Sequence, residues 1–296
     1  MRSGKSQKTW STPVNFSRRE EKLPVPCALC GGDSFKPALS CEGFSFVKCK
    51  HCGLVQMNPQ PLEPEIFHRY ENGEDYLKYE LENEENFLRL ARLALEDAGF
   101  YRLERVLLSG SRARVLDVGC AVGSLLADLK SRGWDVAGVE INRLQAQYAR
   151  QNKGLDVKTM PLEKIGFPDG YFNAVLASHV IEHLNNPASF ISELKRILVP
   201  GGHVYITTPN IGGFQALLFK SRWRSAIFDH LYLFSRKTLT KLLVKKGFII
   251  ESITTWGGLG AGTAPKAVKN LMDKTAKYLN FGDVMVICAL TKTWTK

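Results

Sequence analysis

From Val115 onward, short apolar runs alternate with longer segments of helical spacing. The apolar runs are typical of buried parallel strands, and they read RVLDVG, WDVAGVE, LDVKT, FNAVLAS and HVYITT. The segments between them repeat their apolar positions every three or four residues, as in SLLADLKSRG, RLQAQYARQN and ASFISELKRIL. This regular alternation predicts an α/β fold with a doubly wound, mostly parallel sheet.

The last part of the chain is predicted to complete the sheet after an insertion. Helices are expected in SRKTLTKLLVKKG and KAVKNLMDKTAKYL, and strands in FIIESITTW and DVMVICALTK. Before them, residues 211–230 combine apolar side chains with Lys220, Arg222 and Arg224. A basic amphipathic helix here would rest on an anionic membrane or close over an acidic substrate, whereas a plain lid would only cover the cleft. The sequence leaves these alternatives open.

Composition divides the N-terminal third into three segments. Residues 1–22 are basic and lack apolar periodicity, which predicts a disordered arm. Residues 23–61 are rich in Cys, Gly and Pro and too short for a core of their own, so a bound metal is expected to hold them together. Residues 62–110 are expected to form a helical connector or lid in front of a sheet domain at 111–296, with Tyr76 either covering a bound ligand or packed between connector helices.

Overall composition narrows the class of protein. The chain has 296 residues, of which 44% are hydrophobic, so a sizeable core is expected. Its formal charge of +11 favours acidic partners: phosphorylated small molecules, anionic lipid surfaces or nucleic acid. No segment approaches the roughly 18 apolar residues of a membrane span, and no signal peptide is recognisable. A cytoplasmic location is therefore expected.

Four of the seven cysteines form two close pairs. Cys27 and Cys30 make one Cys-x2-Cys knuckle, Cys49 and Cys52 make the other, and a glycine follows each pair. Four thiolates at this spacing are typical of tetrahedral Zn²⁺, with a rubredoxin-like iron site as the alternative. Because four protein ligands leave no open position, the metal is expected to be structural.

A glycine-rich turn follows the first strand of the sheet domain, in the segment LDVGCAVGS. Dinucleotide enzymes place a pyrophosphate at such a turn, but Asp117 precedes these glycines and would repel a phosphate. Asp117 suits a positively charged group instead. Glu140 ends the next strand, where a carboxylate can accept hydrogen bonds from ribose hydroxyls. These residues indicate a ligand with a ribose and a cationic end.

In these motifs the chain resembles class I S-adenosylmethionine-dependent methyltransferases, particularly the group similar to ubiquinone and menaquinone methylases. The matching segments occur in order from about Val115 to Phe248: LDVGCAVGSLL, GVEIN, FPDGYFNAV, SHVIEHLNNP, ILVPGGHVYITTPN and HLYLFSRKTLTKLLVKKGF. The two knuckles with CGLVQMNPQP resemble the N-terminal zinc ribbon of a subset of these enzymes. The resemblance implies a Rossmann-like, seven-stranded methyltransferase fold.

The resemblance also assigns a cofactor site for S-adenosylmethionine. It implies that Asp117, Gly119, Cys120 and Gly123 cradle the methionine part and that Glu140 accepts the ribose hydroxyls. Two positions depart from the family pattern: Ala121 stands where glycine is common, and Pro161 stands where many members have an aspartate that contacts adenine. Adenine recognition is therefore expected from the backbone around Met160 and Leu162.

Three histidines are candidates for catalysis. His179 follows a predicted strand that should end at the ligand cleft, and a neutral imidazole there is a suitable general base. Glu182 and His183 follow within one helical turn and are expected to orient His179 or the acceptor. His230 resembles a family position near the substrate, although a structural histidine is an equal alternative.

Two absences narrow the chemistry. The strand end lacks the Asn-Pro-Pro-aromatic box of amino-group methyltransferases and an aspartate for a catalytic Mg²⁺, so metal-independent transfer is expected. The leading hypothesis is methylation of an oxygen or carbon atom in a small acidic acceptor: a sugar, nucleotide-sugar, lipid-linked or natural-product-like compound. An RNA base methyltransferase and a non-catalytic S-adenosylmethionine-binding module are the alternatives. The acceptor and the oligomeric state are left open.

Overall fold

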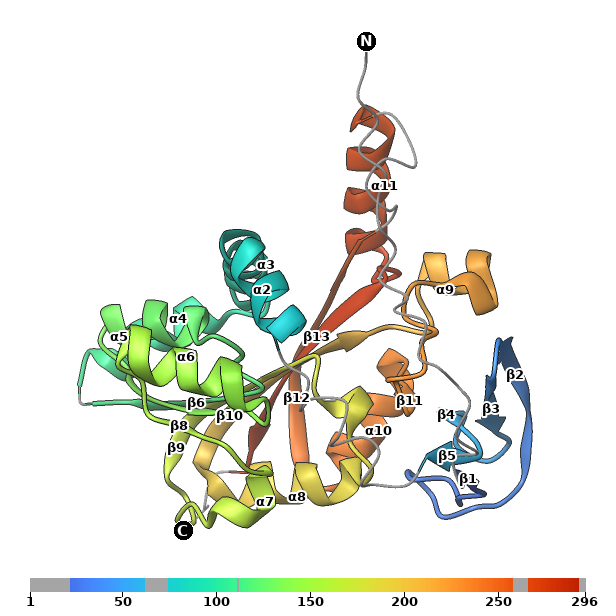
Figure 1. The fold of residues 1–296 in the computed structure, drawn as a ribbon, viewed down its shortest axis with the longest axis horizontal. Coiled ribbons are helices and arrows are strands. Elements are labelled where there is room, and N and C mark those ends of the chain that lie inside the picture. The colour runs from blue at the N-terminus through green and yellow to red at the C-terminus, as the bar shows by residue number, and fades with distance from the viewer. Residues whose placement is uncertain (1–21, 62–73, 111, 258–265, 293–296) are drawn as a thin grey trace.

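The computed structural model describes residues 22–61, 74–110, 112–257 and 266–292. Nearly all of the predicted basic arm, residues 1–22, lies outside the described residues, as does the first part of the connector, residues 62–73. Figure 1 shows a central twisted sheet with helices on both faces and a small β-rich unit at one end. This arrangement matches the α/β class expected from the strand–helix alternation.

The central sheet has seven strands in the order β12-β13-β10-β9-β6-β7-β8. Their bounds are Arg114–Val118 (β6), Asp135–Val139 (β7), Val157–Lys158 (β8), Phe172–Ser178 (β9), Leu198–Pro209 (β10), Phe248–Trp256 (β12) and Val284–Thr291 (β13). Only β13 runs antiparallel to its neighbours β10 and β12, so the sheet is mostly parallel as predicted. Strand β6 pairs in parallel with β7 on one side and with β9 on the other. The chain continues from β6 to β7 and β8 on one side and then returns to β9 on the other, so the strand order reverses at β6. A ligand crevice is expected at such a reversal.

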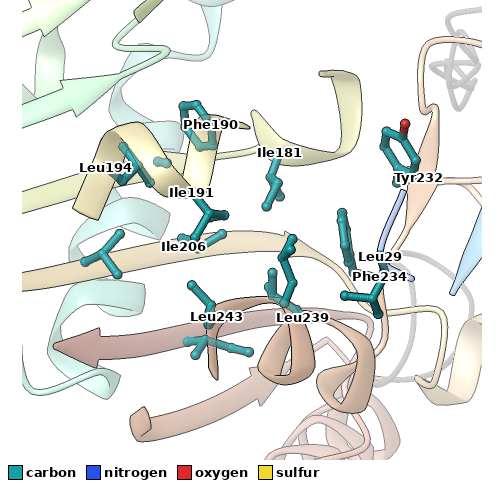
Figure 2. Packing of buried hydrophobic residues seen from close by; sticks show 14 of the residues in the cluster. Leu29, Ile181, Phe190, Ile191, Leu194, Ile206, Tyr232, Phe234, Leu239 and Leu243 are labelled. Atoms are coloured by element: carbon teal, nitrogen blue, oxygen red, sulfur yellow. The ribbon is translucent and has the colours of Figure 1, made fainter. Parts of the chain in front are cut away.

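Alternate residues of the inner strands enter different cores, which shows that the sheet is buried on both faces. In β9, Val175 and Ala177 pack in one cluster, while Ala174 and Leu176 pack in the other. Figure 2 shows the first cluster, in which α8 and α10 contribute Ile191, Leu194, Leu239 and Leu243. The second cluster receives Phe100 and Trp134, whose rings stack at 5.4 Å.

The helices fall between the strands and in the connector. Their bounds are Glu74–Glu82 (α2), Glu84–Asp97 (α3), Phe100–Leu108 (α4), Ser124–Ser131 (α5), Arg143–Lys153 (α6), Leu162–Ile165 (α7), Pro187–Ile197 (α8), Phe214–Phe219 (α9), Arg236–Lys245 (α10) and Lys266–Tyr278 (α11). Short 3-10 helices cover Ile181–His183 (η1) and Lys220–Arg222 (η2). The described part of the connector is helical, as expected, and consists of α2, α3 and α4.

The insertion at 211–230 is not one amphipathic helix. It forms α9, six residues long, and then η2, before the chain turns inward at Trp223, which is buried and donates a hydrogen bond to Asp283. Leu217 and Leu218 are more than half exposed on α9. Within the described residues, we find no helix with the length and apolar character needed to cross a bilayer.

The N-terminal unit contains a four-stranded sheet, one strand of which comes from the larger domain. Strands β2 (Phe35–Cys41), β3 (Phe44–Cys49) and β4 (Val55–Met57) form a meander, and β11 (Tyr232–Leu233) pairs with β4 as the fourth strand. A separate two-stranded ribbon joins β1 (Lys22–Leu23) to β5 (Gln60–Pro61). Leu29 of this unit lies beside Tyr232 and Phe234 in Figure 2, within the same buried cluster as the sheet. The unit therefore shares a hydrophobic core with the larger domain.

Candidate active site and metal centre

A cavity of about 490 Å³ lies where β6, β7 and β9 end at their carboxyl edge. Gly119 follows β6, Glu140 follows β7, and Ser178 ends β9, and all three line the cavity. Helix α7 and the start of α8 form another wall, and Tyr76 of α2 also lines the cavity. This position is the crevice expected at the reversal of strand order.

The turn after β6 brings backbone close to the cavity. Gly119 has a φ of +76°, and a Cβ there would lie 2.6 Å from Val180, so only glycine fits this conformation. The amides of Gly119 and Cys120 both donate to the Val139 carbonyl, at 2.7 and 3.1 Å. Ala121 also has a positive φ, +47°, which gives a physical reason why glycine is common at this position in the family.

Three carboxyl groups come together at this turn. Glu140 is buried and accepts hydrogen bonds from the amides of Ala121 at 2.9 Å and Asn142 at 2.8 Å. Burial, together with the charge of Glu140, raises the pKa of Asp117 to about 8. Burial and the charges of Glu140 and Glu84 raise the pKa of Glu80, on α2, to about 7. Desolvation and neighbouring carboxylates thus destabilise the ionised forms of Asp117 and Glu80, and a cationic ligand would relieve this.

The residues that we predicted as cofactor contacts divide into three groups. Gly119, Glu140, Leu162 and Tyr76 line the cavity. Asp117, Cys120 and Gly123 do not line it; Asp117 and Cys120 are buried beside the turn, and Gly123, with a φ of +79°, caps α5. Met160 is not among the lining residues, although the adjacent Pro161 and Leu162 are, and its contact with the cofactor through the backbone stays a prediction.

His179 is held at the rim of the cavity by the residues around it. Its backbone takes a φ of +55°, which is rare for a histidine, and its amide donates to the Thr207 carbonyl at 2.8 Å. Its Nδ1 lies 3.1 Å from Oε1 of Glu182, whose other carboxylate oxygen accepts from the Thr208 hydroxyl at 2.9 Å. The imidazole therefore carries its proton on Nδ1 and presents the lone pair of Nε2.

The carboxylate partner of His179 is fully buried. Burial alone would raise the pKa of Glu182, but the hydrogen bond from His179 and the attraction to the His179, His183 and His230 rings in their protonated forms lower it to about 2. Glu182 is therefore ionised at all physiological pH values. An ionised carboxylate that accepts the Nδ1 proton orients the ring and stabilises its protonated form.

The other two candidate histidines form a pair behind this rim. His183 lines the cavity and its Nδ1 lies 2.9 Å from the Asp229 carbonyl. His230 is buried, contacts the Ser225 carbonyl through Nδ1 at 2.8 Å, and packs edge-on against His183 at 4.8 Å. Burial and the adjacent His183 lower the pKa of His230 to about 4, so this ring is neutral and lies outside the cavity lining.

Comparison with known proteins identifies the family. A family model described as a methyltransferase domain matches residues 84–253, more than half of the chain. The chain belongs to this methyltransferase family. The family and the mostly parallel seven-stranded fold that we predicted from the sequence are thereby confirmed.

Curated relatives of this methyltransferase include ubiquinone biosynthesis O-methyltransferases. Those of Acinetobacter baylyi and Dechloromonas aromatica are each 32% identical over 104 and 103 residues, respectively, which cover 33% of this chain and 44% of each relative. The chain thus spans less than half the length of the curated relatives that it matches.

Solved structures share the fold. A SAM-dependent methyltransferase from Thermotoga maritima has a TM-score of 0.52 and 21% identity, over 77% of this chain and 99% of that one. Another from Archaeoglobus fulgidus has a TM-score of 0.51 and 22% identity, over 72% of this chain and 99% of that one.

The four knuckle cysteines of this methyltransferase converge on one point. Their sulfur atoms all lie within 4.8 Å of one another, with Cys27 and Cys52 at 3.3 Å and Cys30 and Cys49 at 3.5 Å. Four sulfurs at about 2.3 Å from a tetrahedral zinc lie roughly 3.8 Å apart, so the cluster fits Zn²⁺. Cys41, Cys120 and Cys288 are free thiols that are not part of this cluster.

Several cavity residues of the methyltransferase were not predicted from the sequence. Asn142, Gln145, Ser178, Lys164 and Asn186 all line the cavity and offer polar groups to a ligand. Asn142 and Asn186 cap the N-termini of α6 and α8, which is a signal readable in the sequence. Lys164 and Gln145 lie inside helices, and nothing in the local pattern distinguishes them from surface residues.

Proposed function

We propose that this protein transfers a methyl group from S-adenosylmethionine to a hydroxyl oxygen of a small acidic molecule, with His179 as the general base. The observation that carries the proposal is the hydrogen bond between His179 and the buried, ionised Glu182 at the rim of the cavity. Such a pair prepares a neutral imidazole nitrogen to take a proton from a hydroxyl.

The cofactor assignment rests on the carboxyl groups and the glycine turn. S-adenosylmethionine supplies a methyl group bound to a positively charged sulfur, together with a ribose and an ammonium group. Glu140 lines the cavity and would accept hydrogen bonds from the ribose hydroxyls, and Asp117 and Glu80, which lie near it, would ionise more readily beside a cation. The exposed backbone after β6 lets such a ligand lie against the sheet edge.

The acceptor class rests on the size and charge of the cavity. A volume of about 490 Å³ is in the range of small-molecule sites, about 300–1,000 Å³, rather than of a groove for a polymer. The described cavity lining holds Glu140, Glu163 and one lysine, Lys164, which offers one contact for an acidic group on the acceptor. The curated relatives named as O-methyltransferases support an oxygen as the acceptor atom.

The chain's own residues would act in a defined order. Glu182 accepts the hydrogen bond from Nδ1–H of His179, so Nε2 remains basic and would take the hydroxyl proton as the carbon–oxygen bond forms and the methyl–sulfur bond breaks, with S-adenosylhomocysteine as the leaving group. The positive charge then on the imidazole is stabilised by Glu182, and the proton later leaves to solvent, because the His179 side chain is 50% exposed. The cavity walls hold acceptor and donor in line, which supplies much of the rate.

The test is methyl transfer from methyl-labelled S-adenosylmethionine to a host metabolite extract, followed by treatment with hydriodic acid, which releases methyl iodide from O-methyl groups. We expect a single labelled product that releases its methyl. His179→Ala and His179→Gln should keep cofactor affinity and lose roughly 10²–10⁴ in kcat, because the base acts only in the transition state. Wild-type turnover in both variants would remove His179 as the base, and a stable labelled product would exclude oxygen as the acceptor atom.

A further inference from the structure

A second cavity, of about 450 Å³, lies between the zinc-ligand knuckle and the start of α10. One wall is formed by residues 48–53, which carry two of the four clustered thiols, and the other by residues 235–241. It shares no lining residue with the cavity at the sheet edge. It is therefore a separate site.

The lining of this cavity is strongly basic. Five lysines line it and no acidic residue does: Lys36, Lys48, Lys50, Lys237 and Lys241. None of the five forms an ion pair within the described residues, whereas Lys153, Lys269 and Lys277 elsewhere each pair with a carboxylate. Five like charges around one hollow repel one another, and an anion bound among them would lower this repulsion.

The metal cluster does not account for this charge. Four thiolates around Zn²⁺ carry a net charge of −2, and Cys49 and Cys52 of that cluster line the cavity. The five lysines carry a charge of +5, so three positive charges remain after the −2 of the metal cluster is subtracted. Lys241 makes one polar contact with the knuckle, its Nζ donating to the Cys52 carbonyl at 3.5 Å.

Helix α10 adds to the positive potential. Its ten residues start at the cavity, with Ser235 as the N-cap, and its first turn carries Arg236 and Lys237 but no acidic residue. Basic side chains at a helix N-terminus oppose the helix dipole, and natural helices usually place acidic residues there. A bound anion would satisfy both the dipole and the lysines.

The lining also indicates which anion fits. Lysines are compact point charges that bind phosphate without the planar fork of arginine. The lining holds one aromatic ring, the imidazole of His51, and no phenylalanine, tyrosine or tryptophan, which disfavours single-stranded RNA because its successive bases stack on several rings. We propose that this cavity binds the diphosphate group of a small phosphorylated molecule, at a site distinct from the methyl-transfer cavity.

The proposal is tested by titrating the zinc-loaded full chain with inorganic pyrophosphate in a calorimeter, with zinc content measured before and after. We expect one binding site per chain. The double variant Lys237→Gln/Lys241→Gln should weaken binding at least tenfold while S-adenosylmethionine affinity stays unchanged. The matched control Lys246→Gln/Lys274→Gln removes the same charge outside the cavity and should keep wild-type affinity.

Three outcomes would overturn the proposal. The first is the absence of pyrophosphate binding with zinc still in place. The second is an equal loss in the control variant, which would indicate a general charge effect. The third is binding of a single-stranded oligoribonucleotide, but not pyrophosphate, that depends on Lys237 and Lys241, which would assign the surface to RNA.

Discussion

At the scale of single residues, the carboxyl groups around the cofactor cavity are unusual because burial and mutual repulsion act in the same direction. Asp117 is fully buried beside Glu140, and its pKa rises to about 8. In the empty protein this group is therefore largely protonated at neutral pH. A cationic ligand favours the ionised form, so cofactor binding and proton release should be coupled.

We therefore expect S-adenosylmethionine affinity to increase with pH up to about 8, approaching tenfold per pH unit, and then to level off. The folded pKa is raised, so the unliganded protein binds more protons than the unfolded chain from about pH 4 to pH 8, and its stability falls as pH rises through that window. Calorimetry at several pH values, in buffers of different ionisation enthalpy, measures both affinity and proton release. The variant Asp117→Asn should lose this pH dependence, and an unchanged profile in that variant would show that another group titrates.

At the scale of elements, α2 is the part of the connector that reaches the cavity. Tyr76 lines the cavity although its side chain is 48% exposed, and Glu80, one turn later, is close enough to Glu140 for its pKa to respond. This placement fits the predicted lid, since a bound ligand would bury the ring further. Whether the helix moves is a separate question from whether the ring contributes to binding.

Replacement of Tyr76 by alanine should weaken S-adenosylmethionine binding by about 1 kcal/mol, roughly fivefold, because an aromatic ring that covers a ligand contributes about that much. Tyr76→Phe keeps the ring and should bind nearly as well as the wild type. Tyr278→Ala is the matched control, since Tyr278 lies on α11 and is 85% exposed. Equal affinity of Tyr76→Ala and the control in a calorimetric titration would disprove the lid.

At the scale of the whole molecule, the cysteine-rich unit and the sheet domain are not independent. Strand β11 belongs to the sheet of the N-terminal unit, although it lies more than 170 residues later in the chain than β4. Cys27, Leu29 and Phe46 pack in the same buried cluster as Phe234 and Leu239. Loss of the metal should therefore also lower the stability of the larger domain.

The variant Cys30→Ser should contain no zinc, against one zinc per chain in the wild type, and should lose at least about 3 kcal/mol of stability, because metal binding contributes to folding. For a domain of this size that corresponds to a decrease in Tm of roughly 6–12 °C. Hydrogen exchange should increase at residues 231–239 as well as in the knuckles. Cys41→Ser, in the same unit but outside the four-thiol cluster, should keep both zinc and Tm. A full zinc content in Cys30→Ser would rule out the four-thiol site.

The sequence by itself determined the elements and their order, because a strand or a helix shows its period in neighbouring residues. The strand–helix alternation, the glycine turn after β6 and the spacing of the four cysteines are all local patterns, and each predicted its structure. The insertion at 211–230 was harder to predict, since its apolar and basic residues also suit a long helix. In the structure α9 ends at Phe219, Lys220 takes a φ of +51°, and the buried Trp223 donates a hydrogen bond to Asp283.

Only the tertiary structure decided which distant residues meet. The pairing of β11 with β4, the contact of His183 with His230, and the five lysines around the second cavity join segments that no local pattern relates. The same is true of Glu80 and Glu140, whose mutual repulsion depends on how α2 packs over the sheet edge. Charge, burial and pKa are set by distances in space, and those distances arise only when the whole chain has packed around the sheet.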